Sequence, residues 1–413
     1  MHKRNWVSER INRSYSHQES AWKNGVNNFV FDDYSEKYIH IKNGGKLTEF
    51  ITCSYLGLAE DKRLHQSAIN GIEKFGVQFA APRTRLRTEY NDMLDAKLSA
   101  IFSAHTVLFP TVGLCHLATL PLLGAGELPS YKVPNKPLWI MDKTAHASLQ
   151  ILRAIMEQFG PVLRLDFNDI NELKNAFALS EKQNLTPITV SDGVGSMGGC
   201  APVSDLLMLA EKYNGYIYID DAHGTSILGP RGSGYVMNEM NGVFNKRVIM
   251  TSSLAKAFGS NGGVVCLFSR ADEEKIKKYS TPYIFGGPIS IPVLCASITS
   301  ADIHLSDEIY TLQKKLKDKC ALFDSLSPKN TININKESPI RGLHIGSEGD
   351  AIIINKAMFN QGYACTVAMY PTVPENNAII RVALSTRHTD EQITNFIKTF
   401  KSCMIDLNLY FDK

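Results

Sequence analysis

Several features that would place this 413-residue chain in a special class are missing from it. It has no apolar run of about 18 residues, the length that a membrane-spanning helix needs. Residues 1–22 are polar and of mixed charge, unlike a secretory signal peptide. The chain contains neither an internal repeat nor a low-complexity tract. The net charge is only +3, which gives no general reason to expect a nucleic acid or a membrane as partner.

Cysteine pairs are also missing, although the chain has eight cysteines. The cysteines stand singly, form no Cys-x-x-Cys motif and mostly lie in apolar segments, which predicts free thiols and a reducing, cytoplasmic compartment. They are Cys53, Cys115, Cys200, Cys266, Cys295, Cys320, Cys365 and Cys403. What is present is ordinary: 44% apolar and 21% charged residues indicate a folded globular protein, and the length suits two or three sub-domains.

One lysine stands out because apolar residues flank it after a predicted buried strand. Lys256 lies between Leu254-Ala255 and Ala257-Phe258, and poor hydration disfavours the charged form of a lysine and makes its amine a nucleophile for carbonyls. Hydroxyls at residues 251–253 and a glycine-rich turn at residues 259–263 suit a phosphate group. This stretch alone leaves a solvated lysine beside a loop as an equal alternative.

An acidic pair follows the predicted buried strand Tyr216–Ile219. Asp220 and Asp221 each need a partner, because an unpaired carboxylate in apolar surroundings is costly. In pyridoxal phosphate enzymes such an aspartate pairs with the protonated pyridine nitrogen, an attraction of roughly 5–6 kcal/mol at hydrogen-bonding distance. His223 is placed to reach the phenolic oxygen of the ring. A metal site and a surface turn are the alternatives; the buried strand argues against the turn, and the sequence points to no further metal ligand.

The segments Asp220–Thr225 and Ser252–Gly259 together resemble the α-oxoamine synthases. These are fold-type-I pyridoxal phosphate enzymes that include the aminooxononanoate, aminoketobutyrate, aminolevulinate and serine palmitoyl synthases, with the related α-hydroxyketone autoinducer synthases. Further matches, in family order, are Tyr55–Leu58, His146–Ser148, Ser191–Gly199, Tyr370–Pro374 and Arg381. The resemblance implies a cytoplasmic homodimer with its active site at the subunit interface, and it does not specify a substrate.

The expected fold is α/β, with a mainly parallel central sheet and a smaller α+β C-terminal domain. Short apolar strands alternate with amphipathic helices, and the motifs follow strands, where sites in such sheets collect. We expect an N-terminal arm and hairpin over residues 1–50, a cofactor-binding large domain over 51–290, and a linking helix with a small domain over 291–413. More locally, the pattern predicts a hairpin turn at Asn43-Gly44, one helix over Ile291–Leu326 and a capping box from Thr389 to Gln392.

The resemblance implies roles for individual residues around pyridoxal phosphate. Lys256 holds the cofactor as a Schiff base, Asp220 and His223 contact its ring, and His146 stacks on the ring. The phosphate is expected at a helix N-terminus, where Thr111, Val112 and Gly113 supply amides and a hydroxyl. The remaining predicted cofactor-binding residues are Asp192, Ser196 and Ser253.

Arginines supply the predicted substrate contacts. Arg381 lies in the middle of a predicted strand, and the family arginine at this place binds the carboxylate of the amino-acid substrate, near Tyr55. Arg83, Arg85 and Arg87 alternate along a segment that, if extended, would point them one way toward the phosphates of coenzyme A or of a carrier-protein phosphopantetheine. A solvated or interface-bridging basic edge is the alternative for these three.

Three departures from the family pattern concern the substrate and the phosphate. Cys53 stands where asparagine is usual, Gly286-Gly287 replace residues with hydroxyls, and Ile379 replaces an arginine. These changes question the usual substrate pose and favour a synthase for a signal or a secondary metabolite.

The predicted reaction is a decarboxylative condensation of an α-amino acid with an acyl thioester, from acyl-CoA or an acyl carrier protein. The products are an α-aminoketone, carbon dioxide and a free thiol, and no metal is expected. Two alternatives remain: a fold-type-I aminotransferase, and a degenerate partner subunit that binds the cofactor without catalysis.

Overall fold

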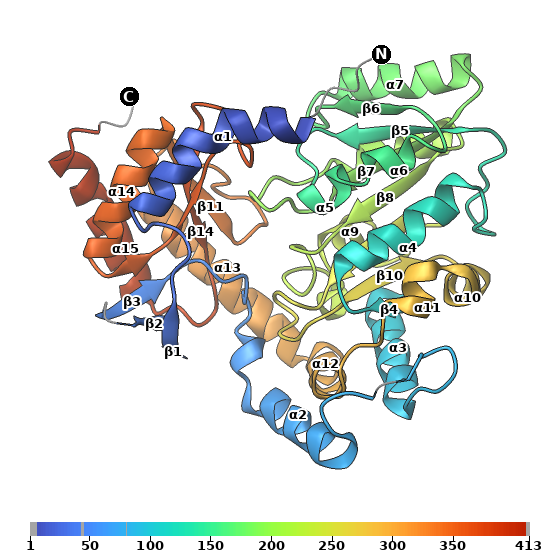
Figure 1. Cartoon of the computed structure of the whole chain (residues 1–413), viewed down its shortest axis with the longest axis horizontal. Helices are drawn as coiled ribbons and strands as arrows, with labels where there is room; N and C mark the ends of the chain where they lie inside the picture. Colours follow the sequence, from blue (N-terminus) through green and yellow to red (C-terminus); the bar gives the residue numbers. More distant parts are fainter. Residues whose placement is uncertain (1–5, 43–44, 80, 410–413) are drawn as a thin grey trace. The chain divides into compact units, whose positions relative to one another are not determined.

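The chain forms two compact units, which we call the large unit and the small unit and describe separately (Figure 1). The large unit is Leu56–Lys314, and the small unit joins Met1–Tyr55 to Lys315–Lys413. This grouping differs from the predicted division after residues 50 and 290, because the N-terminal strands share a sheet with a strand from the C-terminal part. The computed structural model describes residues 6–42, 45–79 and 81–409.

A seven-stranded sheet forms the centre of the large unit, in the order β4-β10-β9-β8-β7-β5-β6. Strands β6, β5, β7, β8 and β9 pair in parallel, whereas β10 runs antiparallel to both of its neighbours. The prediction of a mainly parallel central sheet is thus confirmed. The strands are β4 His105–Phe109, β5 Pro137–Asp142, β6 Val162–Leu165, β7 Thr186–Asp192, β8 Tyr216–Asp220, β9 Val248–Ser253 and β10 Gly263–Leu267.

Both faces of this sheet are buried, so its strands are apolar on both sides. In β8, Ile217 and Ile219 pack into one core cluster, and Tyr216 and Tyr218 pack into the other. Helix α4 packs into the cluster that contains the two tyrosines. The helices of this unit are α2 Lys62–Phe75, α3 Glu89–Phe102, α4 Val112–Gly124, α5 Ala147–Gln150, α6 Arg153–Met156, α7 Ile170–Lys182, α8 Val203–Lys212, α9 Tyr235–Glu239, α10 Arg270–Tyr279, α11 Thr281–Phe285 and α12 Ile291–His304.

The prediction of one helix over Ile291–Leu326 is wrong. Helix α12 ends at His304, and a separate helix α13 spans Glu308–Leu326. Between them, the hydroxyl of Ser306 accepts a hydrogen bond from the amide of Glu308 at 3.3 Å. A serine side chain that binds nearby backbone offers the chain an alternative to helical hydrogen bonds, so the helix stops and begins again here.

The small unit contains two antiparallel-rich sheets, ordered β1-β2-β3-β12 and β11-β14-β13. The predicted hairpin is confirmed as the antiparallel pair β2 and β3, although its turn at residues 43–44 lies outside the described residues. The predicted capping box is also confirmed, with both hydrogen bonds between Thr389 and Gln392 present. The strands are β1 Phe31–Ser35, β2 Tyr38–Ile41, β3 Gly45–Glu49, β11 Ile340–Gly346, β12 Tyr363–Ala364, β13 Thr366–Ala368 and β14 Ala378–Ala383; the helices are α1 Trp6–Lys23, α14 Glu348–Asn360 and α15 Asp390–Asp406.

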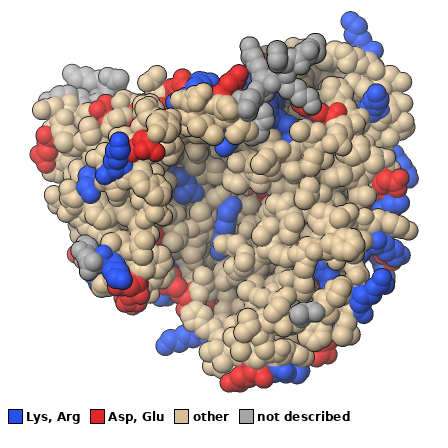
Figure 2. All heavy atoms as spheres, in the orientation of Figure 1, with Lys and Arg blue, Asp and Glu red and all other residues tan. Residues whose placement is uncertain are grey.

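Acidic and basic side chains are interspersed on the face shown in Figure 2, in keeping with a net charge of only +3. Among the described residues, none of the helices combines the length and the apolar character that crossing a membrane requires.

A buried ion pair joins Lys37, just before β2, to Glu49, at the end of β3, in the small unit. Their side chains are 0% and 1% exposed. The hydroxyl of Thr52 accepts from Lys37 at 2.8 Å and donates to Glu49 at 2.7 Å, and the amide of Ile51 donates to the same carboxylate at 2.7 Å. Burial alone would raise the pKa of Glu49, but Lys37 and these hydrogen bonds outweigh burial and lower it.

We predict that Lys37→Met lowers the free energy of unfolding by about 3–5 kcal/mol, because it leaves the Glu49 charge buried without its cation. Urea denaturation measures the change. The double variant Lys37→Met/Glu49→Leu removes both charges and is expected to recover most of the loss. An unchanged urea midpoint for Lys37→Met would contradict this account of the pair.

Candidate active site

Most of the predicted cofactor-binding residues line one cavity of about 220 Å³ in the large unit. It lies at the carboxyl edge of the sheet, since Asp192, Asp220 and Ser253, which line it, end β7, β8 and β9. Residues brought together here that were predicted from sequence are Thr111, Val112, Gly113, His146, Asp192, Asp220, His223, Ser253 and Lys256. Ser196 does not line this cavity and lies in the loop after β7.

Asp220 is buried and ionised. Its Oδ1 atom accepts a hydrogen bond from the amide of Ala222 at 3.0 Å, and its Oδ2 atom lies 3.2 Å from Nε2 of His116. Burial alone would raise the pKa of Asp220, but the interaction with His116, aided by the charge of Lys256, outweighs burial and lowers it. The carboxylate is therefore suited to hold a positive ring nitrogen.

His116 was missed by the sequence reasoning. It is fully buried on α4, and its Nδ1 atom lies 3.0 Å from the hydroxyl of Tyr218. Two features of the sequence pointed to His116. A histidine within the apolar segment 112–124 needs a polar partner, and alternation along β8 puts Tyr218 and Asp220 on the same face of the sheet. What the sequence did not show was that α4 covers that face.

Asp221 is buried like Asp220, but it is neutral. Burial raises its pKa well above the usual value, and the amide of Val236 donates to Oδ2 at 3.1 Å. A methyl group added to Gly193, Gly224 or Gly234 would collide with this carboxyl group, so three glycines form a closed cradle around it. The alternative of a surface turn for the acidic pair is therefore wrong.

Asp192 and His146 form one wall of the cavity. The backbone amide of His146 donates to Oδ2 of Asp192 at 2.9 Å, and its ring Nδ1 lies 2.8 Å from the hydroxyl of Ser148. Burial lowers the pKa of His146, and burial followed by the charge of Asp220 raises the pKa of Asp192 well above its usual range. The buried Oδ1 atom of Asp192 has no hydrogen-bond partner among the described residues.

An anion-binding turn lies at the start of α4. Thr111 is the N-cap of this 13-residue helix, and its hydroxyl accepts from the amide of Leu114 at 3.3 Å. Gly263 on β10 approaches so closely that a methyl group there would lie 2.7 Å from the backbone of Thr111 and Val112. Free amides and the helix dipole favour an anion at this place.

The donor set fits pyridoxal phosphate. An amine on Lys256, an ionised carboxylate on Asp220, an anion-binding turn and an unpartnered buried oxygen on Asp192 all meet at this cavity. These are the groups needed for the aldehyde, the ring nitrogen, the phosphate and a further polar atom of that cofactor.

The three alternating arginines do not point one way, and that prediction is wrong. Residues 83–85 form a turn, with the amide of Arg85 donating to the carbonyl of Pro82 at 2.8 Å. Arg83 is buried, Arg85 is exposed, and Arg87 pairs with Asp92 at 2.9 Å. A turn breaks the two-residue alternation on which the prediction depended.

Arg83 is held by the fold of the large unit itself. It donates to the backbone carbonyls of Tyr283 and Leu108 at 2.8 and 2.7 Å, and its guanidinium lies 3.8 Å from the centre of the Tyr283 ring. Burial lowers the pKa of this guanidinium. These contacts make Arg83 part of the packed interior of the large unit. Binding of substrate phosphates by Arg83 and Arg85 stays a prediction.

In the small unit, Arg381 lies close to Cys53 and Tyr55. Nη2 of Arg381 lies 3.6 Å from Sγ of Cys53, the residue that replaces the usual asparagine. Tyr55 is fully buried, and burial, followed by Cys53, raises its pKa well above the usual value, although Arg381 acts to lower it. Binding of the substrate carboxylate by Arg381 and Tyr55 also stays a prediction.

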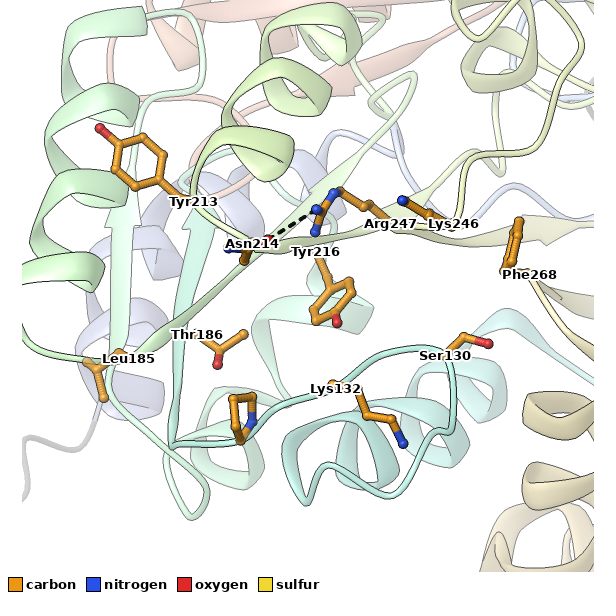
Figure 3. A pocket seen from close by; sticks show the side chains of 11 residues that line it. Ser130, Lys132, Leu185, Thr186, Tyr213, Asn214, Tyr216, Lys246, Arg247 and Phe268 are labelled. Atoms are coloured by element: carbon orange, nitrogen blue, oxygen red, sulfur yellow. Dashed lines mark hydrogen bonds between the residues drawn. The ribbon is translucent and has the colours of Figure 1, made fainter.

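A larger cavity, of about 580 Å³, lies at the opposite edge of the sheet (Figure 3). Thr186 and Tyr216, at the amino ends of β7 and β8, line it together with Lys132 and Arg247. None of the predicted site residues lines it, so the larger of these two cavities is not the one in which those residues meet.

Comparison with known proteins agrees with this site. Residues 162–400 match the model of the family Aminotransferase class I and II. The 8-amino-7-oxononanoate synthases of Alkaliphilus oremlandii and Thermoanaerobacter pseudethanolicus are 29% and 28% identical to this chain, over 89% of its length and 90% of theirs. In fold, the chain is similar to serine palmitoyltransferase from S. paucimobilis, with a TM-score of 0.83, 18% identity, and coverage of 98% of this chain and 100% of that one. An 8-amino-7-oxononanoate synthase from Francisella tularensis gives a TM-score of 0.70 at 20% identity, over 88% and 99% of the two chains.

The fold and the site define a pyridoxal phosphate transferase of fold type I. The chain belongs to the aminotransferase class I and II family and, within it, to the α-oxoamine synthases, which are pyridoxal phosphate-dependent acyltransferases. The predicted family, fold class and cofactor are therefore confirmed.

We predict that Asp221→Asn makes stability less sensitive to pH. The folded chain keeps Asp221 neutral where the unfolded chain ionises it, so its contribution is fully present below about pH 4 and is lost as pH rises. Between about pH 5 and pH 8, the free energy of unfolding should therefore fall less in the variant than in wild type. Urea denaturation at each pH measures this, with the exposed Asp32→Asn as control; parallel profiles for wild type and Asp221→Asn would contradict a neutral Asp221.

Proposed function

We propose that this protein condenses an α-amino acid with an acyl thioester and removes the carboxyl group of the amino acid as carbon dioxide. The carbon–sulfur bond of the thioester breaks, and a carbon–carbon bond forms between the acyl carbon and Cα. The Cα–carboxylate bond then breaks, and Cα regains a proton. The products are an α-aminoketone, carbon dioxide and the free thiol of coenzyme A or of an acyl carrier protein.

The observation that carries this proposal is the meeting of Lys256, Asp220, His223 and His146 in one cavity of an α-oxoamine synthase. The relatives that match nearly the whole chain are named 8-amino-7-oxononanoate synthase, and this supports the same class of reaction. The name of a relative does not transfer its acyl donor to this chain.

Different residues of the cavity bind different parts of the cofactor. When bound, pyridoxal phosphate supplies a cationic ring that accepts the electrons released at Cα. With the cofactor bound, Asp220 would hold the proton of the ring nitrogen, His146 would cover one face of the ring, and His223 would hydrogen-bond to the phenolic oxygen. The turn at Thr111 anchors the phosphate.

Lys256 transfers the proton of Cα. Its side chain lines the cavity, where the amine takes the proton from Cα and later returns it. Arg381 fits the carboxylate of the amino acid, because a guanidinium fork binds a carboxylate through two parallel hydrogen bonds. Holding that group fixes which bond at Cα is aligned with the ring system.

The substrate of this chain differs from that of the biotin and haem precursor enzymes, we propose, and its product is a signal or a secondary metabolite. Cys53 contacts Arg381 in place of the usual asparagine, and the side chain of Ile379 is buried where an arginine is common. Gly286 and Gly287 offer no hydroxyl to a phosphate. A homodimer with the active site at its interface belongs to the same proposal.

Aminotransfer is the second candidate, since the matching family model bears that name. An aminotransferase would pass the amino group to a keto acid without releasing carbon dioxide or thiol. A non-catalytic partner subunit is less well supported, because Lys256, Asp220 and His223 all line the cavity.

We predict that Lys256→Ala loses the visible absorbance of the bound cofactor and lowers the condensation rate by at least about 10³-fold, because the variant lacks the amine that binds the cofactor and moves the proton. Absorbance spectra and thiol release measure the two effects. Lys278→Ala, on the exposed side of α10, is the matched control and should behave as wild type. A Lys256→Ala variant that retains full activity would refute the assignment.

The reaction class is tested with single amino acids combined with a panel of acyl-CoAs, following free thiol. Thiol release that needs both one amino acid and one thioester supports the condensation and identifies the pair. Conversion of a keto acid to an amino acid without thiol release would instead establish the aminotransferase.

A further inference from the structure

His116 lies behind Asp220, outside the cavity. It is 0% exposed and does not line the site, but its Nε2 atom is 3.2 Å from Oδ2 of Asp220. Any effect of His116 on a bound molecule must therefore pass through Asp220.

The fold places this histidine by two periodicities. Gly113 belongs to the anion-binding turn, and His116 follows it by three residues, close to one turn along α4. On β8, Tyr218 and Asp220 are two residues apart and point to the face that α4 covers. One helix thus carries the phosphate-binding turn at its start and the partner of the ring-nitrogen carboxylate one turn later.

The hydrogen-bonding capacity of these groups fixes the direction of each contact. A carboxylate can only accept, so the proton on Nε2 of His116 belongs on the side of Asp220, although the two groups lie 3.2 Å apart without forming a well-aligned hydrogen bond. Burial raises the pKa of Tyr218 well above its usual value, so its hydroxyl keeps a proton that it can donate to Nδ1 of His116, 3.0 Å away. With the amide of Ala222 on Oδ1, both oxygens of Asp220 face a donor.

We propose that His116 is a positioning residue that, together with Tyr218, keeps Asp220 ionised and aimed at the ring nitrogen of bound pyridoxal phosphate, and so determines whether that nitrogen stays protonated. This inference rests on the cofactor contact in the proposed function and not on the identity of the substrates. A purely structural His116 would fill space between α4 and β8, and any side chain of similar size would replace it.

Two variants separate these roles. His116→Gln keeps an N–H donor near the position of Nε2, whereas His116→Leu keeps a similar volume and removes the donor. Tyr218→Phe keeps its ring and removes the hydroxyl that orients the histidine. It provides a second route to the answer if His116→Leu fails to fold.

The experiment uses cofactor alone, without amino acid or thioester. Nitrogen-15 NMR of protein loaded with ring-labelled pyridoxal phosphate, recorded from about pH 5 to pH 8, reports protonation of the ring nitrogen. Titration of the protein with the cofactor at neutral pH gives the dissociation constant. In His116→Leu, the ring nitrogen should lose its proton at a lower pH than in wild type, and the dissociation constant at neutral pH should rise at least about tenfold, one pKa unit being a tenfold change. Tyr218→Phe should shift both readouts in the same direction by less, and His116→Gln should restore both toward wild type.

Identical ring-nitrogen protonation and cofactor affinity in wild type, His116→Leu and Tyr218→Phe would overturn the proposal and leave His116 a packing residue. Equal losses in His116→Gln and His116→Leu would also overturn it, because the retained donor would then make no difference. Wild-type protein that binds no cofactor would refute the proposed function itself, so the two failures are distinguishable.

Discussion

A negative charge kept at the carboxyl end of β8 is the constraint on which the rest of the site depends. Asp220 is almost fully buried, and an unpaired carboxylate there would take up a proton. The interaction with His116 and the amide of Ala222 keep it ionised, whereas Asp221, whose pKa burial raises well above its usual value, is neutral. Two neighbouring residues of the same type thus differ in charge because strand alternation sends them to different surroundings.

The parallel sheet makes this arrangement possible. Strands that run the same way bring their carboxyl ends to one edge, so residues far apart in sequence, such as His146, Asp192 and Lys256, meet at one cavity. Glycines then permit the close approaches that the site needs. Gly263 lets β10 touch the turn at the start of α4, and other glycines close around the neutral carboxyl group of Asp221.

The sequence predicted the parts of the fold and site that depend on local pattern. Alternating strands and helices, the capping box at Thr389 and nine of the residues that line the cavity around Lys256 were anticipated. The missed features depend on tertiary packing or on turns. His116 meets Tyr218 across 102 residues, the three arginines are separated by a turn, and the hydroxyl of Ser306 divides α12 from α13. A motif shows which residues share a site, whereas the partner behind such a residue appears only once the helices are placed on the sheet.

The most direct test of the account uses an amino acid labelled with carbon-13 in its carboxyl group, together with an acyl-CoA. Labelled carbon dioxide and free thiol are measured in the same reaction. The account predicts that the two appear in a one-to-one ratio and that both disappear in Lys256→Ala. Thiol release without labelled carbon dioxide, or transfer of the amino group with neither product, would contradict it.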